Sequence, residues 1–409
     1  QIPPGTYLKF KIERYSKIKP ISFWKIKIGN KNIQYKKACY NLKKIIKDTV
    51  KKNVRSDVKN SVLVSGGLDS NTIVSNANKI SKIKGYSLIS TNPKYDERDK
   101  IKISEKFNNF KVKYISSNKK NSLKILEKII IKSSNILLTP TSLGLALLCE
   151  NIKKDGRRVL LTGIGGDELF CGYYINYLAH INSYNSKSKI FKKKHAFWKQ
   201  NILKFIRNPN LKNFKDSKKK NIRDRLHFFT EGNSIPYNYI KKNKKINIKN
   251  FSKDMFYNNM LQNIYLQSVP TQLMQTDIVS MCYDIESRSP FLSHKLFENV
   301  YKLKKDFFMH NGKPKSLLRD AMKNIFPNEI INNFEKTGFY SPFKSFFGKN
   351  DMKKIKVYLK KSKILNIHLN KKKFLELIDK EDKLITHEES KFLFLCLNLS
   401  ILEKKFFNK

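Results

Sequence analysis

Short apolar runs alternate with helix-length segments in the first half of the chain. The strand-like runs fall at residues 62–64, 86–89, 112–115 and 159–161. Segments 71–83 and 97–107, which lie between them, have the length and pattern of helices. Strands that alternate with helices in this way are typical of α/β proteins with a parallel sheet. The pattern therefore predicts an α/β fold in which ligands bind beyond the carboxyl ends of the strands.

The flanking parts of the chain differ from this pattern. Residues 1–35 predict short strands around Pro3-Pro4-Gly5 and Phe23-Trp24, and an amphipathic helix follows over residues 38–53. Residues 183–220 are rich in Lys, Asn and Ser and weakly periodic, which indicates an insertion or a cover over the site. Helical periodicity returns at residues 254–283, 315–325 and 387–407. The second half is therefore predicted to be mainly helical.

The loop that follows the run at residues 62–64 suits a pyrophosphate. It reads Ser65-Gly66-Gly67-Leu68-Asp69-Ser70. Paired glycines let backbone N–H groups face an anion, and the amino end of the helix expected from Asn71 adds a positive partial charge. A Walker-type loop carries a lysine beside the phosphates, whereas this loop carries Asp69, which suits pyrophosphate together with a metal ion. Taken alone, the Gly-Gly pair also fits an ordinary surface turn.

A second glycine-rich turn follows the run at residues 159–161 and supplies another carboxylate. It reads Thr162-Gly163-Ile164-Gly165-Gly166-Asp167-Glu168. Asp69 and Asp167 each stand just past a strand end, and magnesium usually takes one or two protein carboxylates together with phosphate oxygens. As an isolated pair, they also fit the aspartates that cap helices. With the glycines around them, we predict that they share one Mg²⁺ ion.

Length and charge limit the classes of protein to consider. The chain has 409 residues, and single cores stop growing at roughly 250 to 300 residues, so two domains are expected. Lys and Arg number 84 against 33 acidic residues, which gives a net charge of +51. This excess is spread along the chain, and no basic module interleaved with aromatic residues is present. We therefore expect no specific nucleic-acid partner.

The cysteines and the apolar stretches exclude further classes. The cysteines are scattered and lack Cys-x-x-Cys spacing: Cys39, Cys149, Cys171, Cys282 and Cys396. This distribution argues against structural zinc, an iron–sulfur cluster or a disulfide framework, and predicts reduced core thiols in the cytoplasm. Stretches 136–149 and 392–402 are too short or too interrupted to cross a bilayer, so no membrane partner is expected. Because the chain begins at Gln1 rather than Met, we expect a processed product or an excised piece.

The ordered motifs resemble the synthetase domain of class B, glutamine-dependent asparagine synthetases, a branch of the PP-loop ATP pyrophosphatases. Besides Ser65–Ser70, the matching blocks are Arg55-Ser56-Asp57-Val58, Tyr95-Asp96-Glu97, Gly165–Tyr173, Asp284–Leu292, Leu317-Leu318-Arg319 and Lys336-Thr337-Gly338-Phe339. They occur in family order across nearly the whole chain, whereas any single block is weak support. The resemblance implies a parallel-sheet PP-loop core with a largely helical C-terminal half.

The resemblance also implies a domain organisation. Residues 3–8 resemble the junction that follows a glutaminase domain, and these residues contain no N-terminal cysteine nucleophile. This piece alone should therefore use free ammonia, and a glutaminase domain is expected upstream in the intact protein. The chain divides into a junction at 1–35, a PP-loop nucleotide-binding core at 36–180, a Lys-rich insertion or cover at 181–230 and a helical completion at 231–409. A homodimer is left open.

The implied reaction is adenylation of a carboxylate, with L-aspartate as the leading acceptor, followed by attack of ammonia to give an amide, AMP and pyrophosphate. ATP and Mg²⁺ are the implied cofactors. The expected ATP contacts are Val64, Leu88, Thr162 and Gly163 around adenosine, and Ser65, Gly66, Gly67, Leu68, Asp69 and Ser70 around pyrophosphate. Asp69 and Asp167 would hold the metal, and Lys336 resembles the family lysine near the reacting phosphoryl and acyl groups. Glu168, Glu286 and Arg288 are expected to organise the site.

Three departures from the family pattern bear on the acceptor. Ile164 stands where asparagine synthetases usually carry a Glu proposed to deprotonate ammonium, and an isoleucine cannot accept a proton. Ser293 and Gln275 replace an Asp and a basic residue that are common in the family. An amide ligase that acts on another acceptor, such as a sugar uronate or a peptide carboxylate, is therefore an alternative. A tRNA-modifying PP-loop enzyme is a more remote one, because the later motifs count against it.

Overall fold

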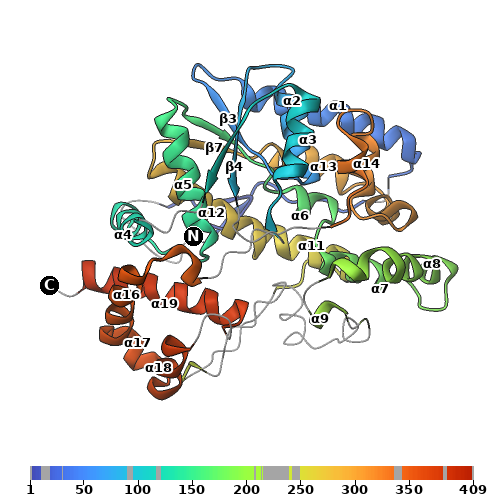
Figure 1. Ribbon diagram of the computed structural model, residues 1–409. Helices are drawn as coiled ribbons and strands as arrows, with labels where there is room; N and C mark the ends of the chain where they lie inside the picture. The colour runs from blue at the N-terminus through green and yellow to red at the C-terminus, as the bar shows by residue number, and fades with distance from the viewer. Residues whose placement is uncertain are drawn as a thin grey trace.

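The computed structural model describes most of the chain, and a parallel sheet forms its centre (Figure 1). The described residues are 2–10, 19–29, 31–89, 95–116, 121–206, 209–212, 214, 239–241, 249–335, 343–380 and 385–407. Within them the central sheet has the strand order β5-β4-β3-β6-β7, and every neighbouring pair is parallel. The strands are β3 (Asn60–Leu63), β4 (Lys84–Ile89), β5 (Val112–Ser116), β6 (Val159–Leu161) and β7 (Glu286–Arg288). The predicted α/β fold is confirmed.

The edge strand β7 was not expected from the sequence. Its backbone pairs with β6 from Val159 opposite Glu286 to Leu161 opposite Arg288. The core predicted at residues 36–180 therefore lacks one strand of its own sheet. The second half of the chain returns to complete that sheet, so the boundary at residue 180 does not divide two independent units.

Helices cover both faces of the sheet (Figure 1). One face carries α1 (Tyr35–Val54), α2 (Leu68–Ala77), α3 (Arg98–Asn108), α13 (His294–Val300) and α14 (Ser316–Ala321). The other carries α4 (Ser122–Ser133), α5 (Thr141–Lys154) and α12 (Ser268–Met281). Consecutive residues of β6 serve different faces, since Leu160 joins the core around α5 and Leu161 joins the core around α1. Burial on both faces explains why these strands read as continuous apolar runs.

The remaining described helices all follow β6 along the chain. They are α6 (Gly166–Phe170), α7 (Tyr174–Asn182), α8 (Lys189–Phe197), α9 (Pro209–Lys212), α11 (Met255–Tyr265), α15 (Asn328–Ile331), α16 (Lys349–Lys361), α17 (Lys363–His368), α18 (Lys371–Asp379) and α19 (His387–Phe406). Short 3-10 or π-helical turns are η2 (Trp198–Ile202), η3 (Leu203–Phe205), η6 (Pro290–Leu292), η7 (Lys305–Gly312) and η8 (Phe343–Phe346). Helices α16 to α19 form a separate layer below the sheet in Figure 1, with α19 packed on α4 and α16. None of the described helices is long and apolar enough to span a bilayer.

The segment predicted as weakly periodic, residues 183–220, is more regular than expected where it is described. Residues 189–205 form α8, η2 and η3, and Phe191, Trp198 and Ile202 are buried in the core beside them. The many lysines hid this pattern because they dilute the apolar positions. Residues 213 and 215–220 lie outside the described part of the chain, so the role as a cover stays a prediction.

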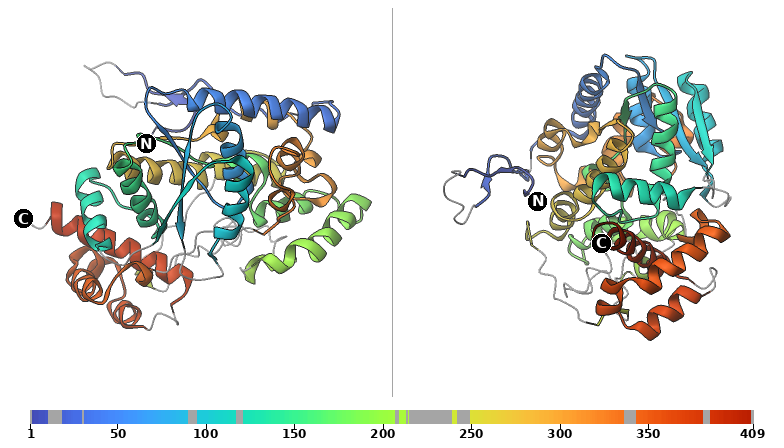
Figure 2. Two further views of the ribbon diagram at one scale, coloured as in Figure 1. Left: turned by 45° about the horizontal axis from the view of Figure 1, so that its top comes forward. Right: turned by 90° about the vertical axis from the view of Figure 1, so that its left-hand side faces the viewer.

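The N-terminal residues form a small antiparallel ribbon instead of joining the central sheet. Its strands are β1 (Thr6–Tyr7) and β2 (Ile21–Ser22), and Figure 2 shows the ribbon projecting from the body. Gly5 has φ +69°, and a Cβ at this position would meet the carbonyl oxygen of Trp24, so the turn requires glycine. Trp24 Nε1 donates to Glu298 Oε1 at 3.0 Å and ties the ribbon to α13.

The Asp155 carboxylate, at the end of α5, fastens the amino ends of two strands. Its Oδ2 lies 2.7 Å from Lys84 Nζ and accepts a hydrogen bond from Tyr86 OH at 2.7 Å, and its Oδ1 lies 3.0 Å from Lys113 Nζ. Burial alone would raise the pKa of Asp155, but the hydrogen bonds from Lys84, Tyr86 and Lys113 outweigh it and hold this pKa well below its usual range. The cluster lies at the sheet edge opposite the predicted site.

We expect Asp155→Asn to lower the free energy of unfolding at pH 7 by about 1 kcal/mol, because it removes charge-assisted hydrogen bonds that are partly exposed. The folded pKa is depressed, so this stabilisation is fully present above the unfolded carboxyl pKa of about 3.9 and is lost as the pH falls towards the folded value. Urea unfolding at pH 7 and pH 3 measures the difference. Equal differences at both pH values would contradict the electrostatic role.

Candidate active site

The first glycine-rich loop joins β3 to α2 and is held in shape by its own side chains. Ser70 Oγ lies 2.9 Å from Ser65 Oγ and donates to the Ser65 carbonyl oxygen at 3.0 Å. Asn71 Nδ2 donates to the Gly67 carbonyl oxygen at 2.7 Å. These hydrogen bonds keep the carbonyl groups of Ser65 and Gly67 turned towards the side chains of α2. Helix α2 begins at Leu68. The first turn of α2 therefore presents Asp69 at the carboxyl end of the sheet.

The second glycine-rich turn brings the backbone of β6 against Asp69. A Cβ at Gly163 would lie 3.2 Å from Asp69 Cβ, and a Cβ at Gly166 would lie 2.5 Å from Asp69 Cγ. Gly165, between them, has φ +93° and directly precedes α6. Only glycines allow this approach of backbone to carboxylate, which gives a physical reason for the glycine-rich composition.

The two predicted aspartates converge on one point, and a lysine occupies it. Lys315 Nζ lies 2.7 and 2.6 Å from the two carboxylate oxygens of Asp69 and 2.6 Å from Asp167 Oδ1. Lys315 is buried and precedes α14 with φ +52°, a left-handed conformation that places its side chain between the two turns. Two carboxylates this close need a shared cation, since like charges otherwise repel.

Two adjoining cavities meet at this point. The smaller, of about 180 Å³, is lined by the loop Ser65–Asp69, by Asp167 and by Lys315 among others. The larger, of about 620 Å³, includes Val64, Leu88, Gly163 and Ile164 in its wall. The residues that line both cavities are Ser65, Asp69 and Glu97. A ligand with a charged end and an uncharged end can therefore extend from one cavity into the other.

Glu168 is buried between the walls of the two cavities. Its Oε1 accepts hydrogen bonds from Tyr173 OH at 2.6 Å, from Gln272 Nε2 at 3.1 Å and from Ser268 Oγ. Tyr173 lines the smaller cavity and Gln272 lines the larger one. Burial, followed by the charge of Glu168, raises the pKa of Tyr173 well above its ordinary value, so its hydroxyl stays a donor. Glu168 thus joins α6 to α12 beside the site.

Several residues named from the sequence lie elsewhere. Glu286 and Arg288 form a two-pronged ion pair at 2.9 and 3.0 Å, and Arg288 Nη1 donates to the carbonyls of Asn53 and Arg55, so the pair fastens β7 to the end of α1. Neither residue lines the two cavities.

Two further residues, Thr162 and Ser293, lie outside the walls of the two cavities. Thr162 is buried beside Ser289, with 2.9 Å between their hydroxyls, and is absent from both cavity walls. Ser293 lines a surface groove beside α1, so its difference from the family does not reshape the site. Lys336, with the rest of the block to Phe339, lies outside the described residues, and its catalytic role stays a prediction.

Sequence reasoning missed Lys315 and assigned no role to Glu97 or Arg319. Lys315 stands directly before the block that contains Arg319, but one lysine is hard to recognise among 84 basic residues. Arg319 donates to the carbonyls of Pro314 at 2.8 Å and Asn333 at 2.9 Å, and so holds part of the wall of the smaller cavity. Glu97 is half-buried, and its partial desolvation raises its pKa.

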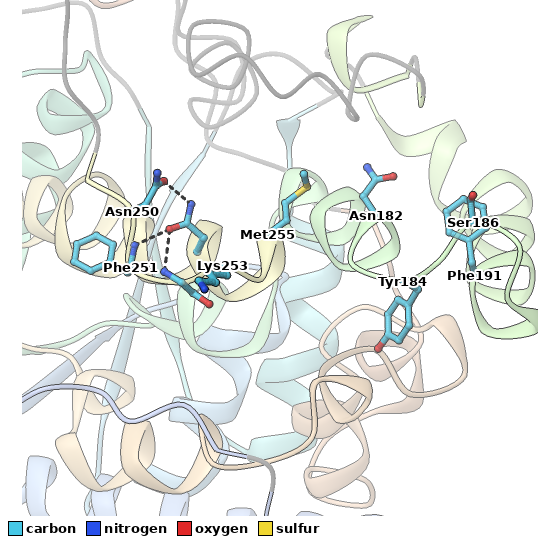
Figure 3. A pocket seen from close by; sticks show the side chains of 10 residues that line it. Asn182, Tyr184, Ser186, Phe191, Asn250, Phe251, Lys253 and Met255 are labelled. Atoms are coloured by element: carbon cyan, nitrogen blue, oxygen red, sulfur yellow. Dashed lines mark hydrogen bonds between the residues drawn. The ribbon is translucent and has the colours of Figure 1, made fainter.

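A third cavity, of about 880 Å³, lies apart from these two and is shown in Figure 3. It is lined by Tyr184 between α7 and α8 and by Phe191 of α8, and on the other side by Asn250 before α11 and Asn258 within it. Its amides bond to each other and to the backbone, as Asn258 Nδ2 does to Asn250 Oδ1 at 3.0 Å. It shares no lining residue with the cavities around Asp69.

Known proteins identify the family to which this arrangement belongs. The family model of asparagine synthase matches residues 41–400. The chain belongs to the asparagine synthase family. It is 24% identical over 385 residues to the glutamine-hydrolysing asparagine synthetase 3 of Bacillus subtilis, a match that covers 88% of this chain and 58% of that protein. The family predicted from the motifs is confirmed, and it places the chain among asparagine synthetase-like ligases.

Two further relatives carry similar names. The glutamine-hydrolysing asparagine synthetase 1 of Bacillus subtilis is 27% identical over 350 residues, which are 75% of this chain and 50% of that protein. A putative asparagine synthetase 2 of Methanocaldococcus jannaschii is 32% identical over 173 residues, 41% of this chain and 32% of the relative. The chain thus spans about half the length of the first two relatives.

Gly172 offers a test of the carboxylate geometry. A Cβ at this position would meet Asp167 Oδ1 and Lys315 Cε, so Gly172→Ala should displace both groups. We expect at least a roughly tenfold loss of magnesium-pyrophosphate affinity, measured by calorimetry, while the fold is retained. Gly156→Asn is the matched control, because Gly156 faces open space at φ +67°, which asparagine tolerates. Wild-type affinity in Gly172→Ala would show that Asp167 and Lys315 do not form the site.

Proposed function

We propose that this chain is the synthetase part of an asparagine synthetase-like enzyme. It activates a carboxylate with ATP, releases pyrophosphate and lets ammonia attack the acyl-adenylate, which yields an amide and AMP. The observation that carries the proposal is the convergence of Asp69 and Asp167 on one cation, at the junction of the two cavities. Family membership supports the same reaction class.

The two cavities suit the two ends of ATP. The pyrophosphate end fits the smaller cavity, where the backbone of Ser65–Ser70 and the start of α2 favour an anion. The adenosine end fits the larger cavity beside Val64 and Leu88, where the backbone at Gly163 is free of a side chain. The α-phosphate would then lie near Ser65, which lines both cavities. The acceptor carboxylate oxygen would bond to the phosphorus of this α-phosphate, and the bond from that phosphorus to pyrophosphate would break.

The donor set fits magnesium. The carboxylates of Asp69 and Asp167, which lie on either side of Lys315 Nζ, are the kind of oxygen donor that would hold magnesium together with phosphate oxygens. Among the described residues there is no cluster of three acidic, histidine or cysteine side chains that would hold a metal alone. Magnesium, when bound, supplies charge neutralisation on the phosphates. Lys315 adds a second positive charge where the leaving pyrophosphate becomes more negative.

The acceptor and the nitrogen source follow from family resemblance and from Ile164. We propose L-aspartate as acceptor and glutamine, through an upstream glutaminase domain, as the normal source of ammonia. The related proteins of Bacillus subtilis are named glutamine-hydrolysing. Ile164 favours a second candidate, because it gives the larger cavity an apolar wall where a proton acceptor is usual in the family. That candidate is an amide ligase for another carboxylate, such as a sugar uronate or a peptide side chain.

The free, buried state of all five cysteines supports a reducing compartment. We therefore place the reaction in the cytoplasm. Cys39, Cys149, Cys171, Cys282 and Cys396 each contribute to packing, as expected for core thiols. We assign no oligomeric state, and light scattering would measure whether the chain forms a homodimer.

The proposal predicts carboxylate-dependent exchange of labelled pyrophosphate into ATP in the presence of magnesium. A panel of L-aspartate, a sugar uronate and a glutamyl peptide separates the two candidates, because the cognate acid should stimulate exchange at least about 100-fold above the rate without acid. Addition of ammonium should then convert the same acid to its amide and yield AMP. Exchange with no acid of the panel would remove both candidates, and exchange with L-aspartate alone would remove the second.

If Asp69 holds the metal, its replacement by asparagine should strongly lower the rate of pyrophosphate exchange. Asp69→Asn keeps the size of the side chain but removes its charge, so exchange should fall at least about 100-fold, with partial recovery at high magnesium. Asp57→Asn is the control, because Asp57 is an exposed acidic residue near the same strand. A rate in Asp69→Asn equal to that of the control would contradict the role of Asp69.

A further inference from the structure

Helix α3 lays a lysine across the first glycine-rich loop. A Cβ at Gly66 would lie 2.6 Å from Lys100 Cβ and 2.9 Å from Lys100 Cδ, so the aliphatic stem packs directly on the loop backbone. The absence of a side chain at Gly66 is what admits this stem. The ammonium group of Lys100 therefore lies beside the loop to which pyrophosphate is assigned.

The ammonium of Lys100 pairs with Glu335. The distance from Nζ to Glu335 Oε2 is 3.1 Å, and each side chain is 33% exposed. Glu335 lines the smaller cavity, so the ion pair lies at its rim. A partly exposed pair of this kind contributes little net free energy, so an exchange of partner has a small energetic cost.

The residue one turn before Lys100 shows that the same loop attracts negative charge. Glu97 Oε2 accepts a hydrogen bond from the Gly66 backbone N–H at 3.4 Å, and Glu97 lines both cavities. This amide belongs to the group that faces an anion in a glycine-rich phosphate loop. Helix α3 therefore presents a carboxylate to the loop amide and an ammonium to the loop's outer side.

We propose that Lys100 is a pyrophosphate-binding residue that exchanges Glu335 for the phosphates of the nucleotide. The stem of Lys100 stays on Gly66, and its Nζ moves from the Glu335 carboxylate to a phosphate oxygen held by Ser65–Ser70. No covalent bond changes, and the two ion pairs simply alternate. This inference rests on the proposed pyrophosphate site and adds a ligand from α3 to those supplied by the two glycine-rich turns.

A purely structural tie between Lys100 and Glu335 makes a different prediction from partner exchange. If the pair only holds α3 to the segment that follows α15, loss of either member disturbs the cavity in the same direction. If Glu335 competes with phosphate for Lys100, its removal frees the lysine and strengthens binding. The sign of the Glu335 effect therefore separates the two mechanisms.

The experiment compares Lys100→Met, Glu335→Gln and Lys102→Met by calorimetric titration with magnesium pyrophosphate. Lys100→Met keeps the stem on Gly66 and removes the charge, so affinity should fall about tenfold. Glu335→Gln should bind roughly two- to threefold more tightly than wild type. Lys102→Met is the matched control on the same helix, because Lys102 is 67% exposed, and its affinity should be unchanged. Thermal unfolding without ligand shows whether each variant is folded.

Three results overturn the assignment. Equal weakening in Lys100→Met and Glu335→Gln would establish a structural tie. Equal affinity of Lys100→Met and Lys102→Met would show that Lys100 does not contact phosphate. A wild-type protein that binds no magnesium pyrophosphate would instead refute the proposed function, and this inference with it, whereas binding by wild type with an unaffected Lys100→Met refutes the inference alone.

Discussion

The site depends on two carboxylates that are held at one point by a buried ammonium. Asp69 and Asp167 leave adjacent strands of a parallel sheet, and their like charges would repel without Lys315 between them. A buried charge is costly unless it is paired, so the lysine and the aspartates stabilise one another only as a set. The glycines at 163, 166 and 172 follow from the same constraint, because side chains there would occupy the space of these groups.

This constraint also explains why the chain must return to its first half. Strands β3 and β6 bring the two aspartates to one edge of the sheet, but the cation comes from the start of α14, and the edge strand β7 comes from residues 286–288. Both the sheet and the charge balance are therefore completed by the second half. The first half of the chain therefore holds neither the whole sheet nor all the charges of the site.

The features that could be predicted from the sequence are those set by neighbouring residues along the chain. The strands before Ser65 and Thr162, the glycine-rich turns and both aspartates were predictable, because an apolar run followed directly by glycines is typical of a strand that ends in a tight turn. Lys315 was not predictable, because its importance comes from burial and a positive φ rather than from composition. Strand β7 was missed since its sequence Glu-Ser-Arg contains no apolar run, unlike the equally short β6, and α8 was missed because lysines dilute its apolar face.

The smaller and the larger cavity differ in the kind of side chains that form their walls. In the smaller cavity, Lys315 is paired with both Asp69 and Asp167, so a substitution of any one of them alters the charge balance of the other two. In the larger cavity, the wall includes Ile164 and uncharged side chains of α12, and the amide oxygen of Gln275 is already bonded to Leu138 N at 2.6 Å and Ser142 Oγ at 3.1 Å. Such a side chain contributes mainly shape to a ligand. A change at Ile164 therefore alters the wall of the larger cavity and leaves the ion pairs of Lys315 with Asp69 and Asp167 in place.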